Sequence, residues 1–356
     1  MHRDLVAERG WISEADYKDG LALAQLAPGP LAAQLAMYLG YVHYRVLGAT
    51  LVGLAFVLPS FLLVLALSVA YTAYGGLPWM QAMFYGVGAS VIGIIAVSAT
   101  KLTRKSLGAD RWLWAYFLVA AAVTIGTHTE PVLLFVGAGL VQWWRKTSPS
   151  GGRPGGRAAV VSGPFGLLLT GVLGRATGNN VLTQLFWFFT KAGAFVFGSG
   201  LAIVPFLHGG VVEQYGWLND AQFLDAVAVA MITPGPVVIT VAFIGYLVAG
   251  LPGACVAALA TFLPCYVLTV VPAPYFHKYG QRPGIRAFVE GITAAAIGAL
   301  SGAVVVLAQR TLVDGPTVGL AAATALLLWR VKGLPEPILL LFAAGIGAAL
   351  KLWSGG

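Results

Sequence analysis

Two Pro-Gly-Pro motifs, at residues 28–30 and 234–236, interrupt long apolar stretches of this sequence. Proline has no backbone N–H and pushes the residue before it out of the helical region, so neither motif can lie inside a continuous helix. Proline does suit the first turn of a helix, because the backbone N–H groups there have no acceptor within the helix and the missing one is not needed. Each motif therefore predicts a break, after which a new helix begins near Pro30 or Pro236.

The apolar stretches around these motifs are typical of a membrane protein. Of 356 residues, 58% are hydrophobic and 10% are charged, whereas soluble domains carry about a quarter charged residues. The sequence therefore predicts an all-α polytopic membrane protein in the lipid bilayer, with about 11–12 segments long enough to span or enter it. We expect them near residues 20–44, 46–74, 80–100, 112–126, 130–144, 158–173, 181–207, 221–249, 253–275, 285–309, 311–330 and 335–354.

The charged and metal-binding residue types exclude several functions. The net charge is +8, but the basic residues stand singly or in loop clusters, as expected for cytoplasmic loops rather than a nucleic-acid site. The two cysteines, Cys255 and Cys265, lie in apolar segments, and the five histidines stand apart. Without clustered His, Asp or Glu, we expect no enzyme activity, no metal and no cofactor.

Aligning the two motifs reveals two homologous halves. GWISEADYKDGLALAQLAPGP at 10–30 matches GWLNDAQFLDAVAVAMITPGP at 216–236 with a constant offset of 206. After a one-residue slip the offset is 205, which pairs Leu58-Pro59 with Leu263-Pro264. The same offset pairs Gly86 with Gly291 and Gly93 with Gly298. We therefore expect a first repeat over 1–146, a linker with a possible short crossing over 147–180, and a second repeat over 181–356.

The first repeat lacks a counterpart of residues 181–207, which are long enough to span a bilayer. We interpret this as a missing first membrane helix. A start codon assigned too far downstream, or a real deletion, would account for it.

Basic clusters in the loops predict how the repeats are oriented. The clusters at 101–111 and 145–157 belong on the cytoplasmic side by the positive-inside rule. The clusters at 278–286 and 330–332 face the same side if residues 158–173 also cross, which inverts the second repeat relative to the first. An odd number of crossings per half produces inverted-repeat transporters.

The depth of the breaks points to an anion site. Asp19 to Pro28 is nine residues, about 14 Å of helix, which reaches roughly the middle of a ~30 Å hydrocarbon core. Non-helical backbone at that depth must be buried in protein or line a watery cavity, and a helix N-terminus attracts anions. We expect the two breaks to meet in a midplane anion pocket; the alternative is a pair of kinks that only shape packing. The residues concerned are Pro28, Gly29, Pro30, Pro234, Gly235 and Pro236.

Further polar residues near the breaks are candidates for the same site. Lys191 lies about ten residues into an apolar run, where a lysine costs about 2.5–3.5 kcal/mol and is functional unless it snorkels to an interface. Gly198 and Gly200 would permit close approach of a helix or a ligand. Gln25 and Gln34 flank the first break and could bond either a ligand or the broken backbone.

Three carboxylates have weaker assignments. We interpret Asp19 and Asp225 as residues that begin their helices and complement the helix dipole, in preference to proton carriers. Glu290 is a weaker candidate for proton coupling.

Together these motifs resemble the chromate ion transporter family, in its long-chain, two-repeat form. The resemblance rests on FGSG at 197–200, a following Gly-Trp-Leu, the Pro-Gly-Pro motifs, and the Gly-Tyr, Gly-Ala and Leu-Pro pairs. It implies efflux of chromate, a sulfate-like dianion, across the bacterial inner membrane, driven by the proton motive force. It also implies substrate-binding roles for Lys191, Phe197-Gly198-Ser199-Gly200 and the Pro-Gly-Pro motifs. Transport of sulfate or another anion, and a truncated inactive paralogue, are the alternatives, and the sequence leaves the oligomeric state open.

Overall fold

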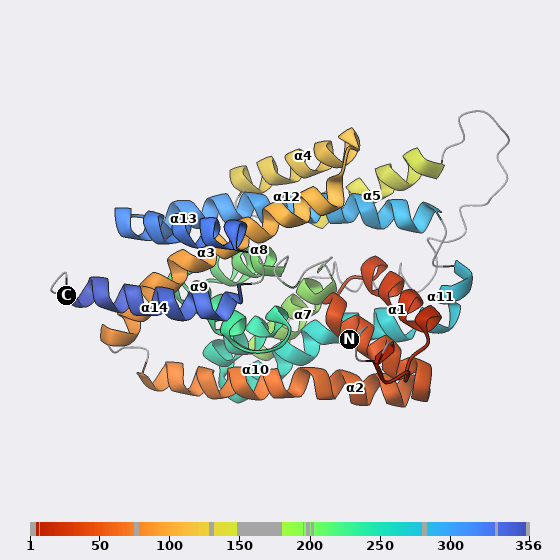
Figure 1. Ribbon diagram of the computed structural model, residues 1–356, viewed down its shortest axis with the longest axis horizontal. Helices are drawn as coiled ribbons and strands as arrows, with labels where there is room; N and C mark the ends of the chain where they lie inside the picture. Colours follow the sequence, from red (N-terminus) through yellow and green to blue (C-terminus); the bar gives the residue numbers. More distant parts are fainter. Residues whose placement is uncertain are drawn as a thin grey trace.

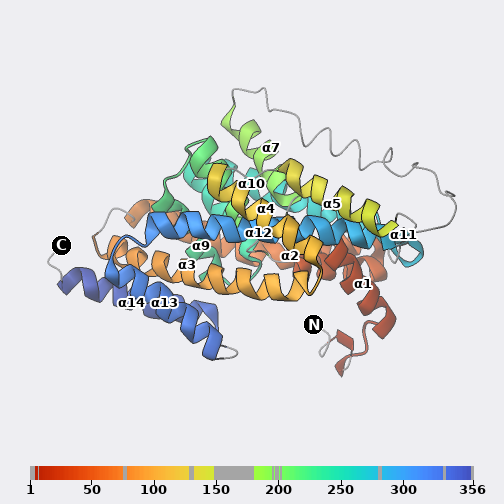
Figure 2. The same cartoon turned by 90° about the horizontal axis from the view of Figure 1, so that it is seen from above.

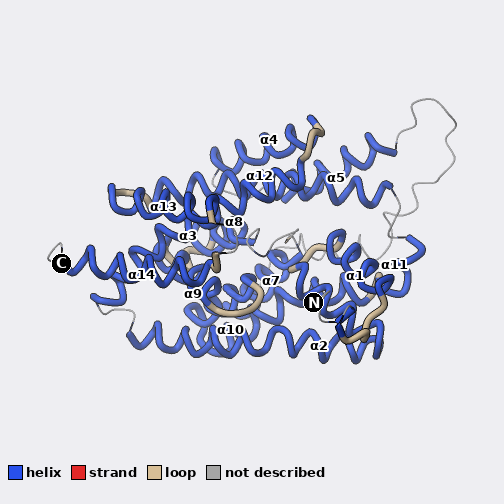
Figure 3. The backbone as a smooth tube through the Cα atoms, viewed as in Figure 1, coloured by secondary structure: helices blue, strands red, loops and turns tan. Residues whose placement is uncertain are grey.

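The structure, a computed structural model, describes residues 5–6, 8–74, 78–127, 132–147, 180–194, 196, 200, 203–279, 283–331 and 334–353. Within these ranges the secondary structure is helical, without strands (Figures 1 and 3). The helices are α1 (Glu14–Leu26), α2 (Leu31–Tyr74), α3 (Pro78–Leu107), α4 (Arg111–Thr127), α5 (Val132–Thr147), α7 (Val181–Ala194), α8 (Ile203–His208), the π-helical turn η3 (Gly209–Gln214), α9 (Asp220–Ile232), the 3-10 turn η4 (Val237–Ile239), α10 (Thr240–Val270), α11 (Ala273–Tyr279), α12 (Pro283–Thr311), α13 (Gly315–Arg330) and α14 (Glu336–Trp353). The expected crossing at 158–173 lies outside the described residues.

Several helices are long and apolar enough to cross a membrane. Among the described residues these are Leu31–Tyr74, Trp79–Leu107, Val237–Phe276 and Pro283–Thr311. Their outer faces carry exposed leucines, for example Leu54, Leu58 and Leu62 at 54%, 50% and 54% exposure. A stripe of exposed leucines at helical spacing suits contact with lipid rather than water. The prediction of an all-α, multi-pass membrane protein is confirmed.

The first Pro-Gly-Pro motif lies at the tip of a hairpin. A Cβ on Gly20 of α1 would lie 2.5 Å from the ring of Tyr38 in α2. Along a straight helix these two residues would be about 27 Å apart, so the chain must turn back between them. The predicted break is confirmed, because α1 ends at Leu26 and α2 begins at Leu31. The expectation that residues 20–44 form one membrane segment with a break in it is wrong, since these residues enter the protein and return as two antiparallel helices.

A second reversal follows within α2. Tyr44 and Arg45 have non-helical backbone angles, and Arg45 has a φ of 52°. A Cβ on Gly40 would lie 2.5 Å from the carbonyl oxygen of Gly48, although eight residues of straight helix span about 12 Å. The long part of α2, from residue 46 onward, therefore runs back along the hairpin.

The second repeat is built in the same way. The motif at 234–236 separates α9 from η4, and α10 reverses at Ala249 and Gly250. A Cβ on Gly245 would meet the carbonyl of Gly253, as Gly40 meets Gly48. Small residues let the two arms approach closely at both sites.

Helices α7 and α8 pack against each other as the two arms of a third hairpin, so the expected single span over 181–207 is wrong. The rings of Phe188 in α7 and Phe206 in α8 stack with centroids 5.4 Å apart. A straight helix would separate these residues by about 27 Å. Gly210, further along, also packs against the Phe188 ring. Aromatic stacking thus folds α8 back onto α7.

Each repeat completes the other. Helices α4 and α5 pack along α12 of the second repeat, whereas α13 and α14 pack along α3 of the first (Figure 2). The paired glycines mark these contacts: Gly86 lies against the backbone of Ala343, and Gly291 lies against that of Ala138. Ala138 and Ala343 are themselves 205 residues apart. Reciprocal contacts between equivalent residues are the mark of a two-fold relation.

The two repeats are inverted, as predicted. A Cβ on Gly88 of α3 would lie 4.0 Å from the methyl group of Thr311 at the end of α12. At the other end of α3, Leu107 shares an apolar cluster with Ala294, in the first half of α12. The equivalent helices α3 and α12 therefore run antiparallel, which requires one repeat to be inverted relative to the other.

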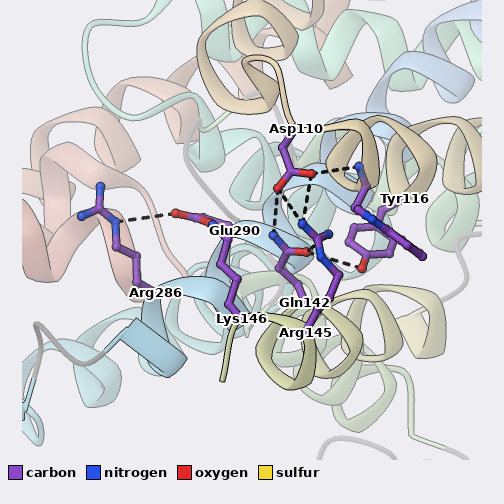
Figure 4. Close-up of polar contacts among 8 residues, drawn as sticks. Asp110, Tyr116, Gln142, Arg145, Lys146, Arg286 and Glu290 are labelled. Carbon is purple, nitrogen blue, oxygen red and sulfur yellow. Dashed lines mark hydrogen bonds and ion pairs between the residues drawn. The ribbon is translucent and has the colours of Figure 1, made fainter. Parts of the chain in front are cut away.

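Ion pairs join α5 to the loop before α4 (Figure 4). The Arg145 guanidinium lies 3.3 Å from the Asp110 carboxylate, which also accepts hydrogen bonds from the Trp112 amide at 2.9 Å and the Gln142 side chain at 3.3 Å. Partial burial raises the pKa of Asp110, but these hydrogen bonds and the Arg145 charge outweigh it, so the pKa is lowered overall.

A second ion pair at this end holds α12. Lys146 lies 2.6 Å from Glu290, and Arg286 lies 3.6 Å from the same carboxylate (Figure 4). Arg145, Lys146 and Arg286, from clusters that the charge bias assigned to one membrane face, thus meet at one end of the molecule. Glu290 serves here as an anchor between helices, which argues against the proton-coupling role considered for it.

Candidate functional site

The tip of the first hairpin is a buried, strained turn. Pro28, Gly29 and Pro30 are all buried, and Gly29 has a φ of +143°, which side chains rarely adopt. The Gly29 amide donates a 2.6 Å hydrogen bond to the carbonyl oxygen of Val196. A Cβ on Gly29 would lie 2.9 Å from the Cys265 sulfur. Glycine is therefore required both by the backbone conformation and by the close approach of Cys265.

Gln34 is bonded within this tip, whereas Gln25 is exposed and its role stays a prediction. The Gln34 side chain is fully buried, and its Nε2 donates a 2.7 Å hydrogen bond to the carbonyl oxygen of Pro28. Its Oε1 has no hydrogen-bond partner within the described part of the chain. Gln25 is exposed. Of the two interpretations left open by the sequence, bonding to the broken backbone holds for Gln34, and a free acceptor atom remains beside it.

The second tip docks onto the first repeat. The Ser60 hydroxyl in α2 donates a 2.7 Å hydrogen bond to the carbonyl oxygen of Pro234. Gly235 has a φ of +139°, and a Cβ there would overlap the Ser60 side chain. Pro236 is buried, but Pro234 and Gly235 are exposed, unlike their counterparts at the first tip. The two tips thus share a backbone geometry and differ in their exposure to solvent.

Ser60 and Cys265 contact the tips, and the motifs did not predict them as part of the site. Cys265 follows Ser60 by the repeat offset of 205 residues. Each touches the tip glycine of the other repeat. The available signal was their position directly after the aligned Leu58-Pro59 and Leu263-Pro264 pairs.

Two residues that follow α7, Val196 and Gly200, contact the regions of the two tips. Val196 bonds Gly29 of the first tip, and a Cβ on Gly200 would lie 3.5 Å from Val237 and Val238, directly after the second motif. One contact thus joins Val196 to the first tip and another joins Gly200 to the start of the helix after the second motif; the common anion pocket stays a prediction. Gly198 lies outside the described residues.

Lys191 lies on the helix that delivers this segment. It is partly buried in the last turn of α7, five residues before Val196. Nearby, Gly193 packs against the backbone of Thr261, one turn before Cys265 in α10. The close contact between α7 and α10 therefore places the lysine on an element seated against the first tip.

The local electrostatics favour an anion. The first amides of a helix have no acceptor within it, and here the start of α2 and η4 both face the tips. The Ile239 amide is not free, because it donates a hydrogen bond to the Pro236 carbonyl oxygen at 2.9 Å. The remaining helix N-terminal amides supply partial positive charge without a fixed cation. Within the described ranges, no group of three His, Cys, Asp or Glu side chains forms a metal site.

Asp225 lies elsewhere than the sequence suggested. Helix α9 begins at Asp220, and Asn219 caps it in a reciprocal pair with Gln222. Asp225 is therefore beyond the first turn, where a carboxylate no longer gains much from the dipole. It is buried and accepts a 2.7 Å hydrogen bond from Tyr71. The dipole interpretation is wrong for Asp225, and for Asp19 too, since α1 begins at Glu14.

Comparison with known proteins gives a consistent result. The profile of the family described as "Chromate transporter" matches residues 1–143 and 183–349. A "Chromate transport protein" from Cupriavidus metallidurans is 64% identical over 347 residues, covering 98% of this chain and 86% of that protein. A "Probable chromate transport protein" from Synechococcus elongatus is 59% identical over 355 residues, covering 99% and 90%. No solved structure matches the chain.

Proposed function

This chain belongs to the chromate transporter family, and we propose that it is a secondary active transporter that exports chromate across the bacterial inner membrane, coupled to the proton motive force. The family consists of transporters rather than enzymes. Chromate is a tetrahedral dianion, so its carrier needs positive potential in a site from which the ion can leave again.

One observation carries the proposal. The first hairpin contacts Val196 and the second lies beside Gly200, and both residues follow the lysine-bearing helix α7 in the chain. Helix N-termini and one ammonium group attract a dianion. They hold it less firmly than a cage of arginines with bidentate hydrogen bonds would. We assign substrate binding to Lys191, Gly198, Gly200 and the two Pro-Gly-Pro tips.

The inverted hairpins also suggest how access alternates. The first hairpin and the second enter the protein from opposite ends, because their repeats are inverted. Rocking one repeat against the other would open the tips to one end at a time. The exposed Pro234 and Gly235, against the buried Pro28 and Gly29, fit a state that is open toward the second hairpin.

The charge distribution supports an orientation. The end of α3 with Lys101, Arg104 and Lys105 and the end of α5 with Arg145 and Lys146 carry the basic loops. We assign this end to the cytoplasm by the positive-inside rule. The opposite end, where α3 begins, then faces the periplasm.

Transport in everted inner-membrane vesicles tests this function. Radiolabelled chromate should accumulate inside vesicles that contain the protein when respiration acidifies their lumen, and a protonophore should abolish this accumulation. Excess unlabelled sulfate added outside measures selectivity: weak competition supports chromate, whereas equal competition supports a general sulfate-like substrate. Absence of accumulation above that of empty-vector vesicles would contradict export and favour an inactive paralogue.

A further inference from the structure

A cavity of about 970 Å³ lies beside α9, where α2 ends and α3 begins. Its lining runs from Trp79, which is 51% exposed, to Asp225, which is 8% exposed. The cavity therefore leads from the surface to a buried carboxylate. Thr311 also lines it, and the Thr311 hydroxyl has no partner among the described residues. A buried hydroxyl of this kind normally bonds water.

Asp225 sits in largely apolar surroundings at the inner end of this cavity. The Asp225 carboxylate accepts a hydrogen bond from the Tyr71 hydroxyl at 2.7 Å. The Tyr71 ring is held edge-on by Phe84 and Phe243, with centroids 5.5 and 5.1 Å away. Transferring an ionised carboxylate into such a place without a cation is costly, and binding a proton removes the charge.

The other titratable groups around α9 have partners of their own. They are Tyr85, His208, Glu213, Asp220, Arg310, Asp314 and Lys351. Arg310 lies 2.5 Å from Glu213 and 3.5 Å from Asp220. His208 also contacts Asp220, at 2.6 Å. The Lys351 ammonium lies over the Tyr85 ring at 5.3 Å. Arg310 and His208 thus pair with acids other than Asp225.

The first repeat provides an internal comparison. Asp19 is the counterpart of Asp225, and Phe276 is the counterpart of Tyr71 by the offset of 205. The hydroxyl that bonds Asp225 is thus replaced by an apolar ring on the Asp19 side. Asp19 is also partly exposed. The repeat symmetry supplies the carboxylate twice, but among the described residues a buried tyrosine–carboxylate pair forms only with Asp225 of the second repeat, whose partner Tyr71 comes from the first repeat.

We propose that Asp225 is the carboxylate that binds the coupling proton and that Tyr71 positions it; this rests on the proposed proton-driven export. When the cavity faces the periplasm, a hydronium ion in it gives a proton to Asp225; one O–H bond of hydronium breaks, a carboxylic O–H bond forms, and water is left. After the repeats rock, the proton leaves to cytoplasmic water and the carboxylate is restored. Chromate moves in the opposite direction through the site between the tips.

Purified full-length protein in liposomes separates coupling from substrate binding. Two rates are measured with radiolabelled chromate: accumulation driven by an imposed pH gradient, and exchange with unlabelled chromate at equal pH. Asp225→Asn should lose accumulation by tenfold or more and retain exchange, because a permanently neutral side chain cannot cycle a proton. Asp19→Asn, the matched control, should retain both. Continued accumulation by Asp225→Asn, or loss of its exchange in a folded protein, would overturn the proposal.

Infrared spectroscopy tests the assignment of the proton to Asp225 without measuring transport. Difference infrared spectra across a pH titration should show a carboxylic C=O band in the wild type and in Asp19→Asn that is missing in Asp225→Asn. Tyr71→Phe should move the midpoint of this band while leaving chromate exchange intact. If wild-type protein shows the band but no gradient-driven accumulation, the proposed coupling fails while the proton site stands. If accumulation occurs and the band does not titrate, the site assignment is wrong and export stands.

Discussion

The Ser60 hydroxyl donates a 2.7 Å hydrogen bond to the carbonyl oxygen of Pro234, which ties the long helix of one repeat to the hairpin tip of the other. Cys265, the counterpart of Ser60, lies against Gly29 in the first tip. Each tip is therefore seated on the opposite repeat. Movement of one repeat against the other must change the distance between the tips, which is the motion that alternating access needs.

Replacing Lys191 tests the role of its charge. Lys191→Ala should reduce chromate export by about tenfold or more, because a hydrogen bond to a charged group contributes roughly 1.5–3 kcal/mol. Chromate uptake into everted vesicles, with membrane expression checked by immunoblot, measures the effect. Lys18→Ala, which removes an exposed lysine paired with Glu14, should transport normally. Unchanged transport in Lys191→Ala would remove this lysine from the site.

A methyl group at the second tip should disable it. Gly235→Ala forces a side chain into a φ of +139° and onto Ser60, a strain of about 1–3 kcal/mol. We expect lower thermal stability in detergent and loss of transport. Gly319→Ala on α13, where a new Cβ meets nothing within 4 Å, should leave both unchanged. Wild-type transport by Gly235→Ala would mean that the tip backbone does not hold this geometry.

The swapped packing of the repeats predicts a disulfide. The hydroxyl oxygens of Ser90 on α3 and Thr324 on α13 are 2.6 Å apart. In a background with Cys255 and Cys265 replaced by alanine, Ser90→Cys with Thr324→Cys should cross-link on mild oxidation. Protease cleavage between the repeats, followed by a non-reducing gel, detects the link. Ser90→Cys with Leu326→Cys, which puts the second thiol on the exposed face of α13, is the control pair, and equal linking of both pairs would contradict the arrangement.

The ion pair at Asp110 should make stability depend on pH. The pKa of this carboxyl is lower in the folded state, so its contribution is full above the unfolded pKa of about 3.9 and is lost as the pH falls through the folded value. Asp110→Asn should lower the Tm at pH 7 by roughly 1–3 °C. The difference from wild type should shrink below about pH 4. Glu14→Gln, in an exposed pair with Lys18, should change the Tm little at either pH. A pH-independent difference for Asp110→Asn would contradict the ion-pair explanation.

Local chemistry made part of the site predictable. Proline fixes where a helix must stop, so the breaks after Leu26 and Ile232 followed from the motifs alone. The capped starts of α1 and α9 lie at Ser13 and Asn219, which are 206 residues apart. Neither feature depends on distant parts of the chain.

Other expectations failed because a break in a helix does not fix the angle between the two helices that flank it. The sequence of 181–207 suits one membrane-spanning helix as well as two antiparallel ones, and packing of Phe188 on Phe206 decides between them. Asp225 was misread for a related reason. Its partner, Tyr71, lies 154 residues away in the chain, and no local pattern indicates that meeting.

The amino-acid sequence by itself determined that the chain is helical and membrane-embedded, that it consists of two homologous repeats, and that both repeats break at a Pro-Gly-Pro motif. These properties follow from hydrophobicity, proline geometry and internal similarity, all of which act within a few residues or can be read by alignment. Only the tertiary structure decided that the broken segments are hairpins and that each tip rests on the other repeat. It also showed that one of two equivalent aspartates faces a cavity beside a tyrosine. Such contacts depend on side chains brought together from distant segments by the packing of inverted halves, and spacing along the chain does not specify them.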